Sequence, residues 1–588
     1  MPDCRFDERV TIQIEMLLWT LKKLWFMRFG MANAPNIPPI TASQRHVVTR
    51  QWLAPDKWSL LGLAITTLVV LPIATIFYLA LFPDENIWPH MLSTTLPRYV
   101  CNSLVMMAGV GVLAGTVGTL TAWLVVMYRF PGWSVLQWAL LLPLSLPAYI
   151  AAFAVVDFLE YAGPAQTWLR EFFGWATKHD YMFPEIRSRG IAILVLASAL
   201  YPYVYFLTRS VFRTQSGAAI EVSRALGCGP VGSFFRVGLP LARPAIAASV
   251  AIVMMETLNE FGAMEFFAVQ TLTTGIFSVW LDGSNAGGAA QLACVILAFV
   301  FVLVVLEKFS RRRIKFHETA RRMRPPKPLN MPKTAGWAAT MLCTLPIMTG
   351  FLFPISILID HALGRWELWT DPEIWASMLR TVALSSTAAG FTVVVGVLLV
   401  FSVRLMRNRL MSRLLPITTI GYSAPGAVLG LGILFPLAAI DHSFADAVLW
   451  VTGFDPGLLL IGSMGAVVLA YCVRFFAISV GTIDAAFTKI SPNLSMASRS
   501  LGKTPRQTLI QLYTPLIKGA TATAGLLIFV DAAKELPATL LLYSEQTLAT
   551  AVYNRASLED IEGAAPAALV IVLISLVAVV IVSLANSD

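Results

Sequence analysis

A pair of carboxylates stands inside a long apolar stretch of the sequence. Glu256 and Glu260 belong to the segment ETLNEFGA, within an apolar run from about residue 245 to residue 269. A spacing of four residues places both side chains on one face of a helix. Ionised side chains are costly in a membrane and persist where they face a bundle interior, a wet cavity or a partner. Because hard metal cations prefer carboxylate oxygen to sulfur ligands, such a pair could bind or pass a hard cation.

The same pair occurs again 275 residues later. ETLNEFGA aligns with DAAKELPA, in which Asp531 and Glu535 repeat the two acids. If the two segments flank a common axis, four carboxylates converge on one path, and we expect them to line or gate it. The alternative role is structural. Lys534 can neutralise the second pair, and the acids can bind backbone groups that are freed where a helix breaks, as the aligned Pro537 suggests.

The composition indicates that membrane-spanning helices position these acids. Of the 588 residues, 57% are hydrophobic and 13% are charged, and the mean hydropathy is +0.71. A soluble chain of this length would form several more polar domains. We predict an all-α polytopic membrane protein, because apolar runs of about 20 residues, enough to cross roughly 30 Å of hydrocarbon, recur along the chain. The twelve predicted spans lie near 60–82, 103–127, 135–159, 190–212, 245–270, 289–309, 336–360, 380–403, 413–440, 458–482, 518–543 and 564–586.

Lysine and arginine are concentrated on one side of these spans. Of the 43 basic residues, 34 fall in the N-terminal tail and in loops on one side, among them 209–243 and 474–518. By the positive-inside rule this side is the cytoplasm, and both termini lie there. The net charge of +9 then reflects topology, and we expect no nucleic-acid partner. The six cysteines form no CxxC pair, so the sequence fixes neither a disulfide framework nor a metal site.

The chain consists of two similar halves. Arg224-Ala-Leu-Gly227 recurs as Arg499-Ser-Leu-Gly502 at an offset of 275, and LSLPA at 144–148 aligns with YSAPG at 422–426 at an offset of 278. Six spans in each half give both copies the same orientation, so an axis along the membrane normal relates them and a path can run along it. We assign a cytoplasmic tail at 1–58, a first half at 59–310, a basic cytoplasmic linker at 311–335 and a second half at 336–588.

Each half carries a patterned loop between its fourth and fifth spans. The first loop runs EVSRALG from Glu221 to Gly227 and reaches Leu239-Pro240 after further residues. It resembles the pattern EAA–x3–G–x9–I–x–LP, the signature loop of binding-protein-dependent ABC transporter permeases. The second loop keeps the glycine and proline spacings but begins with Met496 in place of the glutamate. We call these segments, 221–240 and 496–515, the signature loops.

The resemblance implies a type I (MetI-like) importer fold in which each signature loop forms a coupling helix that docks on one of two ABC ATPase subunits. If Glu221 pairs with a basic residue of the ATPase, only the first loop can form this pair, so the contacts of the two loops with the ATPase differ. The implied coupling residues are Glu221, Ala225, Gly227, Leu239, Pro240, Met496, Ala497, Gly502 and Pro515. Leu501-Gly-Lys-Thr504 lacks the earlier glycine of a phosphate-binding loop. We therefore expect a transport subunit that is not an enzyme and binds no cofactor, with ATP and Mg²⁺ used by the partner ATPase.

Two stretches are similar, more narrowly, to bacterial ferric iron permeases with two fused halves. They are ETLNEFGAMEFFAVQTLTTGIFSVW at 256–280 and KELPATLLLYSEQTLATAVYNRAS at 534–557. This resemblance implies import of ferric iron through the bacterial inner membrane, with delivery by a periplasmic ferric-binding protein. Two alternatives stay open. The same machinery could carry thiamine, phosphonate, polyamine or sulfate, or the chain could be an ion-coupled secondary transporter or channel, whose loops would tolerate disruption.

Overall fold

A computed structural model describes residues 57–214, 222–223, 225–312, 328–406, 418, 424–488 and 490–585. Most of the predicted N-terminal tail and most of the predicted linker lie outside the described residues, as does Glu221. The described chain from Trp58 onward forms one compact unit. It is almost entirely helical, apart from one short parallel pair between β1 (Tyr128–Arg129) and β2 (Leu329–Asn330).

The helices follow the two-half organisation of the sequence. The first half contains α3 (Lys57–Leu81), α4 (Trp88–Ser93), α5 (Leu96–Met127), α6 (Trp133–Ala139), α7 (Ala148–Leu159), α8 (Pro164–Phe173), α9 (Arg189–Thr214), α11 (Pro230–Ser233), α12 (Leu239–Asn259), α13 (Gly262–Phe266), α14 (Leu272–Phe277) and α15 (Ala286–Arg312). The second half contains α16 (Lys333–Ile347), α17 (Phe353–Gly364), α18 (Pro372–Met406), α20 (Gly426–Thr452), α21 (Met464–Thr488), α22 (Pro492–Ser500), α23 (Pro505–Thr508), α24 (Thr514–Ala533), α25 (Pro537–Leu542), α26 (Leu548–Ser557) and α27 (Ile561–Ala585).

The long helices agree with the prediction of a polytopic membrane protein. In the described chain, eleven helices or continuous helix pairs are long and apolar enough to cross a membrane, and a twelfth span results if one bent pair is counted as a unit. That pair corresponds to the predicted span 135–159, which is not one straight helix. It bends by 89° between Ser145 and Ala148. The bend follows from Pro147, which has no N–H to continue the helix and disfavours helical backbone in the residue before it.

Two further predicted spans are too long. The run 245–270 ends as a helix at Asn259, where α13 follows after a break, and the run 518–543 ends at Ala533, where α25 follows. α12 and α24 begin a few residues earlier than predicted, at Leu239 and Thr514, and Pro240 and Pro515 occupy their first turns, where no N–H is needed. The helix ends, and not helix middles, therefore carry the acids.

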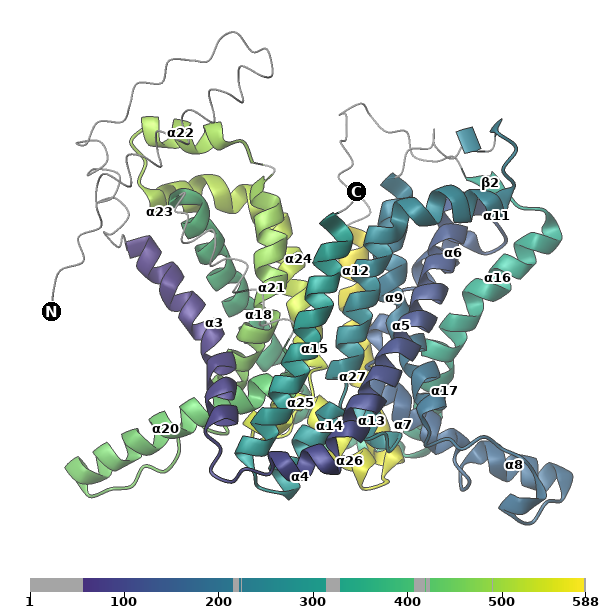
Figure 1. Cartoon of the computed structure of the whole chain (residues 1–588), viewed down its shortest axis with the longest axis horizontal. Helices are drawn as coiled ribbons and strands as arrows, with labels where there is room; N and C mark the ends of the chain where they lie inside the picture. Colours follow the sequence, from purple (N-terminus) through teal and green to yellow (C-terminus); the bar gives the residue numbers. More distant parts are fainter. Residues whose placement is uncertain are drawn as a thin grey trace, which may run out of the picture. The chain divides into compact units, whose positions relative to one another are not determined.

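The first helix of each half packs on the other half. Ile65 and Val69 of α3 share an apolar core with Leu399 and Val400 of α18. In the opposite direction, α16 packs against α5 and α6, and α17 packs against α7. Figure 1 shows α3 beside the green helices of the second half and α16 beside α5 and α6. The two halves are therefore joined by an exchange of helices as well as by their central contact.

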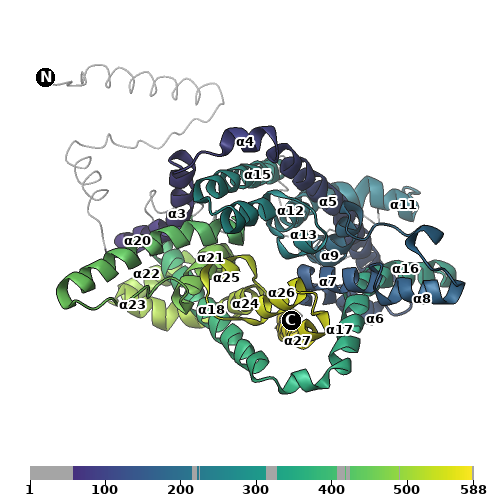
Figure 2. The ribbon, with the colours of Figure 1, turned by 90° about the horizontal axis from the view of Figure 1, so that it is seen from below.

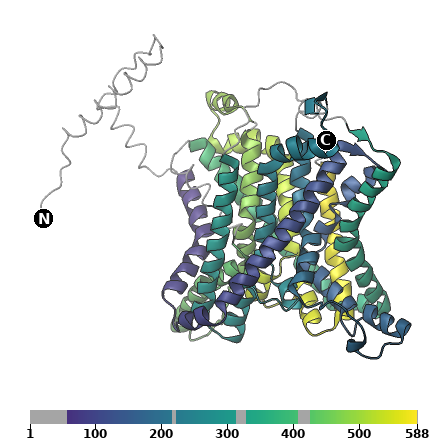
Figure 3. The same ribbon diagram turned by 45° about the vertical axis from the view of Figure 1, so that its right-hand side comes forward.

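The long helices run side by side between two ends of the bundle (Figure 3). The signature-loop helices α11, α22 and α23 lie at one end, and α4, α8 and α26 lie at the other (Figure 1). We call these the loop end and the opposite end. Viewed along the bundle, α12, α13, α24 and α25 lie near its middle, where the two halves meet (Figure 2). The four acids are thus carried by the central elements.

Candidate functional site

The acids sit at two matching breaks in the central helices. Glu256 lies in the last turn of α12, and Glu260 follows the helix with extended backbone. One carboxylate oxygen of Glu260 accepts a hydrogen bond from the backbone N–H of Ala263, at 3.1 Å. The second half repeats this arrangement, because Glu535 accepts from the backbone N–H of Ala538 at 3.0 Å. These bonds satisfy donors at the start of the short helices α13 and α25, which a break leaves without intrahelical partners.

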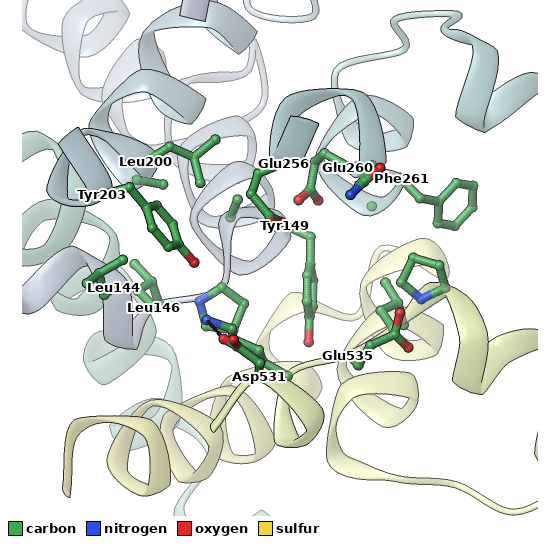
Figure 4. Close-up of a pocket in the computed structure, with 18 of the residues that line it drawn as sticks. Leu144, Leu146, Tyr149, Leu200, Tyr203, Glu256, Glu260, Phe261, Asp531 and Glu535 are labelled. Carbon is green, nitrogen blue, oxygen red and sulfur yellow. Dashed lines mark ion pairs between the residues drawn. The ribbon is translucent and has the colours of Figure 1, made fainter. Parts of the chain in front are cut away.

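All four acids line one cavity of about 120 Å³ between the two halves (Figure 4). Its wall combines the helix ends of α12 and α24 with the bend that precedes α7 and with parts of α9 and α21. The polar residues of this wall are Tyr149, Tyr203, Glu256, Asn259, Glu260, Arg474, Asp531, Lys534 and Glu535. The structure thus brings the four predicted residues to one place. Among the described residues, no three His, Cys, Asp or Glu side chains lie close enough together to hold a metal ion.

The second-half acids of this pocket are paired with cations. Asp531 and Lys534 form an ion pair at 3.0 Å. The structural role considered in the sequence analysis included this pair. Glu535 forms an ion pair with Arg474 of α21, and the Glu535 side chain is only 2% exposed. Thr539 also donates its hydroxyl proton to the Glu535 backbone oxygen at 3.0 Å. The second half therefore neutralises its own carboxylates.

The first-half acids have no such counter-charge. Within the part of the chain that the structure describes, Glu256 makes no hydrogen bond or ion pair, and Glu260 makes only its bond to the α13 backbone. Four carboxylates and two cationic side chains line the pocket. When all of them are ionised, two negative charges are left in excess, and both belong to the first half.

The sequence analysis missed four polar residues of the pocket, Tyr149, Tyr203, Asn259 and Arg474, and misplaced the last of them. Arg474 was counted with the loop 474–518, but it lies inside α21 and contributes to the pocket wall. Arg209 was likewise counted with a loop, yet it is buried in α9 and donates to Gln137 at 3.0 Å. Tyr149 and Asn259 drew no attention, because a single neutral polar residue in an apolar run carries little signal. An arginine within an apolar span was the signal that could have been used.

A second cavity extends from the first one toward the loop end. It measures about 360 Å³ and shares Leu144, Tyr203, Asp531 and Lys534 with the acid-lined pocket. Its remaining wall is mainly apolar and continues along α9 to Arg209 and Arg213. α9 ends one residue after Arg213, on the side of the first signature loop. The Asp531–Lys534 ion pair and Tyr203 therefore lie where the two cavities meet.

The signature loops have the same local structure in both halves. Gly227 and Gly502 have φ angles of +80° and +72°, in the left-handed region that favours glycine. After Gly227, the N–H of Cys228 donates to the carbonyl of Ser223 at 3.0 Å, and after Gly502, the N–H of Lys503 donates to Ser498 at 3.2 Å. This six-residue bond is the Schellman arrangement that ends a helix. The glycine spacing of the motif thus has a structural cause.

A hydroxyl pair fixes each signature loop to the helix that follows. Ser223 and Ser233 lie 3.0 Å apart between their side-chain oxygens, and Ser498 and Thr508 lie 2.8 Å apart. Both pairs are buried and have the same offset of 275 residues, but the sequence analysis did not single them out. They hold the loop helix against the short helix, α11 or α23, that leads into α12 or α24.

The signature loops carry exposed apolar side chains. Exposed side chains include Val222 and Leu226 in the first loop and Met496 and Leu501 in the second, with Leu226 79% and Leu501 77% exposed. The motif residues Ala225, Gly227, Ala497 and Gly502 are exposed as well. Leu239 and Pro240 begin α12, and Pro515 lies in the first turn of α24. Exposed apolar groups on two matching loops are typical of a protein-binding surface.

Comparison with known proteins identifies the architecture. The family described as "Binding-protein-dependent transport system inner membrane component" matches the chain twice, over residues 110–316 and 392–587. The chain belongs to this family. It is a multi-pass inner-membrane permease with two fused family domains, which confirms the predicted fold class and family. Permeases of this family are transport subunits that work with an ATPase and a substrate-binding protein.

Several relatives resemble the permease along most of its length. It is 26% identical to the Fe(3+)-transport system permease protein FbpB 2 of Haemophilus influenzae over 82% of this chain and 88% of that protein. It is 21% identical to the ferric transport system permease protein FbpB of Actinobacillus pleuropneumoniae over 84% and 72% of the two chains. The sulfate transport system permease protein CysT of Escherichia coli is 29% identical, but over only 34% of this chain and 73% of its own length.

Proposed function

We propose that this permease is the membrane subunit of an ATP-driven importer of ferric iron. Its similarity to proteins named for Fe(3+) and ferric transport, over more than four fifths of its length, supports this cargo. The observation that carries the proposal is the pocket between the halves, whose carboxylates outnumber its cationic side chains by two. Such a lining attracts a hard cation, which prefers oxygen ligands, and repels an anion.

In this proposal, Glu256, Glu260, Asp531 and Glu535 line the translocation path. The acid-lined pocket receives the cation, and the cavity that continues toward the loop end is its route of release. The two cavities meet at the Asp531–Lys534 pair, so cargo has to pass this pair to leave. The largely apolar wall of the second cavity offers few ligands there. Weak binding on the exit side favours release.

The signature loops couple this path to a separate ATPase. Each loop docks on one subunit of an ATPase dimer, which binds ATP and Mg²⁺, while the permease itself binds no cofactor. The docking surface includes the exposed parts of both loops, and α12 and α24 begin where the loops end. A movement of the loops therefore reaches the helix ends that carry the acids. This mechanism places the loop end and both termini in the cytoplasm, and a ferric-binding protein at the opposite, periplasmic end.

The sulfate relative gives weaker support to an anionic cargo. Its similarity covers about one third of this permease, which is close to the length of one family domain. A sulfate ion in the central pocket would face four carboxylates, and both cationic side chains there are already paired. Unpaired cations or backbone N–H groups are the features that an anion site requires.

Replacing Glu256 and Glu260 together by glutamine tests the proposal. The double variant removes both excess negative charges but keeps the size of the side chains. We expect uptake of labelled ferric iron, by cells that lack the native gene, to fall at least about tenfold, which corresponds to about 1.4 kcal/mol. Uptake of labelled sulfate and thiamine should stay at the level of cells without the gene.

The matched control is Glu171→Gln, which alters an exposed carboxylate of α8 outside the pocket. This variant should transport ferric iron like the native permease. Unchanged ferric uptake and unchanged stimulation of the ATPase by the binding protein in the double variant would remove the acids from the path. Gene-dependent uptake of sulfate without ferric uptake would remove the cargo assignment.

A further inference from the structure

Two helical segments at the opposite end of the bundle correspond to each other in the two halves. The first is α8, residues 164–173, and the offset of 278 that aligns LSLPA with YSAPG places residues 442–451, the end of α20, opposite it. We call these two segments the wings. Figure 1 and Figure 2 show α8 and α20 extending outward on opposite sides of the bundle. The buried residues of α20 lie at 426–433 and at Asp441, so the second wing extends beyond the core.

The first wing turns polar side chains toward its own chain. Gln166 is buried, donates to the carbonyl of Leu159 at 2.7 Å and accepts from the hydroxyl of Tyr181 at 2.6 Å. Arg170 donates to the carbonyl of Tyr161, also at 2.7 Å. These bonds hold α8 against the residues that precede and follow it. The inner side of this helix is therefore its polar side.

The same helix turns an apolar stripe outward. Ala165, Trp168, Leu169 and Phe172 have the spacing i, i+3, i+4 and i+7, which places them on one face, and all four are exposed or half-buried. The rings of Trp168 and Phe172 stack on each other, with centroids 5.4 Å apart. In a soluble protein such a stripe faces the core. Because α8 has the reverse orientation, its apolar stripe needs an apolar environment outside the protein.

The second wing exposes side chains at the aligned positions. Phe172 and Phe173 align with Trp450 and Val451. Phe172 is 68% exposed and Trp450 is 88% exposed, and the residue after each is exposed as well. Contiguous exposed apolar groups mark surfaces that contact a partner or a membrane. Their occurrence at matching places in both halves indicates that both wings meet the same environment.

Both wings continue from membrane segments. α8 begins at Pro164, shortly after α7 ends at Leu159, and belongs to the bent pair of membrane helices, while the second wing is the end of the candidate span Gly426–Thr452. Arg170, which is bonded within its own loop, is the only lysine or arginine of either wing. Helices with exposed tryptophan and other large apolar residues are typical of the membrane–water interface. The low positive charge favours insertion of apolar groups over attraction to anionic headgroups.

We propose that the two wings are interfacial helices that insert their exposed apolar side chains into the lipid surface at the opposite end of the bundle. This inference does not depend on the cargo. It gives the wings a role near the acid-lined pocket, because each wing follows a helix that starts there. Ala148 of α7 lines the pocket, and Gly426 of α20 packs against Arg474 and Glu535. The wings thus fix the far ends of these two helices to the membrane surface.

Photocrosslinking identifies what covers the wings. The full-length permease is produced with p-benzoylphenylalanine at Phe172 or at Trp450, in cells that contain the complete transporter, and is irradiated in its native membrane. The excited benzophenone inserts into a nearby C–H bond, so the mass of the product identifies the neighbour. We expect adducts with one phospholipid at both positions. Because both side chains are exposed, the fold should tolerate the probe.

Two further positions calibrate the result. Phe301 is an exposed residue of the membrane helix α15 and should also give phospholipid adducts. Glu171 lies on α8 outside the apolar stripe, and a probe there should give far fewer adducts. After reconstitution in nanodiscs of phosphatidylcholine alone, the adducts at Phe172 and Trp450 should persist, since insertion does not require anionic lipid. Their dependence on anionic lipid would overturn the apolar mode of binding.

The remaining outcomes decide between lipid, protein and water. Crosslinks from both wings to a soluble binding protein, without phospholipid adducts, would overturn the proposal and make the wings a protein-docking surface. Adducts at Phe301 but at neither wing would place the wings in water, which also overturns it. Adducts at one wing alone would overturn the shared role. None of these results bears on ferric uptake, so the proposed function can fail or stand independently.

Discussion

Replacing Arg474 by methionine is expected to destabilise the permease by about 3–5 kcal/mol. Its guanidinium group pairs with Glu535, whose side chain is 2% exposed, so the variant leaves a buried carboxylate without its counter-charge. Gly426 packs directly against this ion pair, because a Cβ atom at that position would overlap both Arg474 and Glu535. The midpoint of thermal unfolding of the purified permease, followed by tryptophan fluorescence, measures the effect.

Two further variants show whether the effect comes from the buried charge. Arg474→Met with Glu535→Gln removes both charges and should regain most of the lost stability, since a neutral amide is less costly to bury. Lys534→Met breaks the neighbouring pair, whose side chains are 21% and 25% exposed, and should have a smaller effect. If the single and double variants at Arg474 and Glu535 unfold at the same temperature, the ion pair does not support this region.

Valine at both Gly227 and Gly502 is expected to reduce transport to the background level. Each glycine adopts a positive φ angle, which costs a β-branched residue roughly 1–2 kcal/mol or more and disrupts the bond that ends the loop helix. A Cβ atom at either glycine would meet no atom of the described residues within 4 Å, its chain neighbours aside. The effect on the permease alone is therefore confined to backbone strain. Ferric uptake and ATP hydrolysis by the complete transporter measure it.

Asparagine at the same two positions is the matched control. It adopts positive φ angles more easily than valine, so uptake should be largely retained if backbone conformation is the cause. The amount of permease in the membrane should be similar for both double variants, because the loops lie at the end of the bundle. Full transport by the valine variant would favour a secondary transporter or channel, which needs no coupling to an ATPase.

The sequence predicted the long helices well because a bilayer leaves few alternatives. Apolar runs of sufficient length and an internal repeat led to the helical class, the approximate spans and the two-half arrangement. The breaks were harder to predict. Apolar composition continues past Asn259 and Ala533, so hydropathy extends the spans, whereas a local change in backbone ends the helices there. Pro147 and Pro537 can be read from the sequence. Whether a proline ends a membrane helix, however, depends on which neighbouring groups satisfy the backbone groups that the break frees.

The sequence predicted the four acids of the site but not most of the residues around them. Charged residues at repeated positions stood out in the sequence, and all four acids do line one pocket. Arg474, the partner of Glu535, comes from another helix, and spacing along the chain does not reveal contacts across it. Arg474 is 61 residues from Glu535, and Tyr149 is more than 100 residues from Glu256. Tyr149 becomes noticeable only when its hydroxyl is found buried without a partner.

The exchanged first helices affect the order in which the chain can be completed during synthesis. In the complete structure, the Thr349 hydroxyl lies 3.1 Å from the hydroxyl of Ser198 on α9. When synthesis has reached only residue 312, Thr349 does not yet exist and this surface of α9 is uncovered. Asp157 still awaits His361, 2.8 Å away in the finished structure. At the same time, α3 has no α18 to pack on. The first half can therefore complete its packing only after the first helices of the second half have been synthesised. Because both halves belong to one polypeptide, each first half is always linked to a second half.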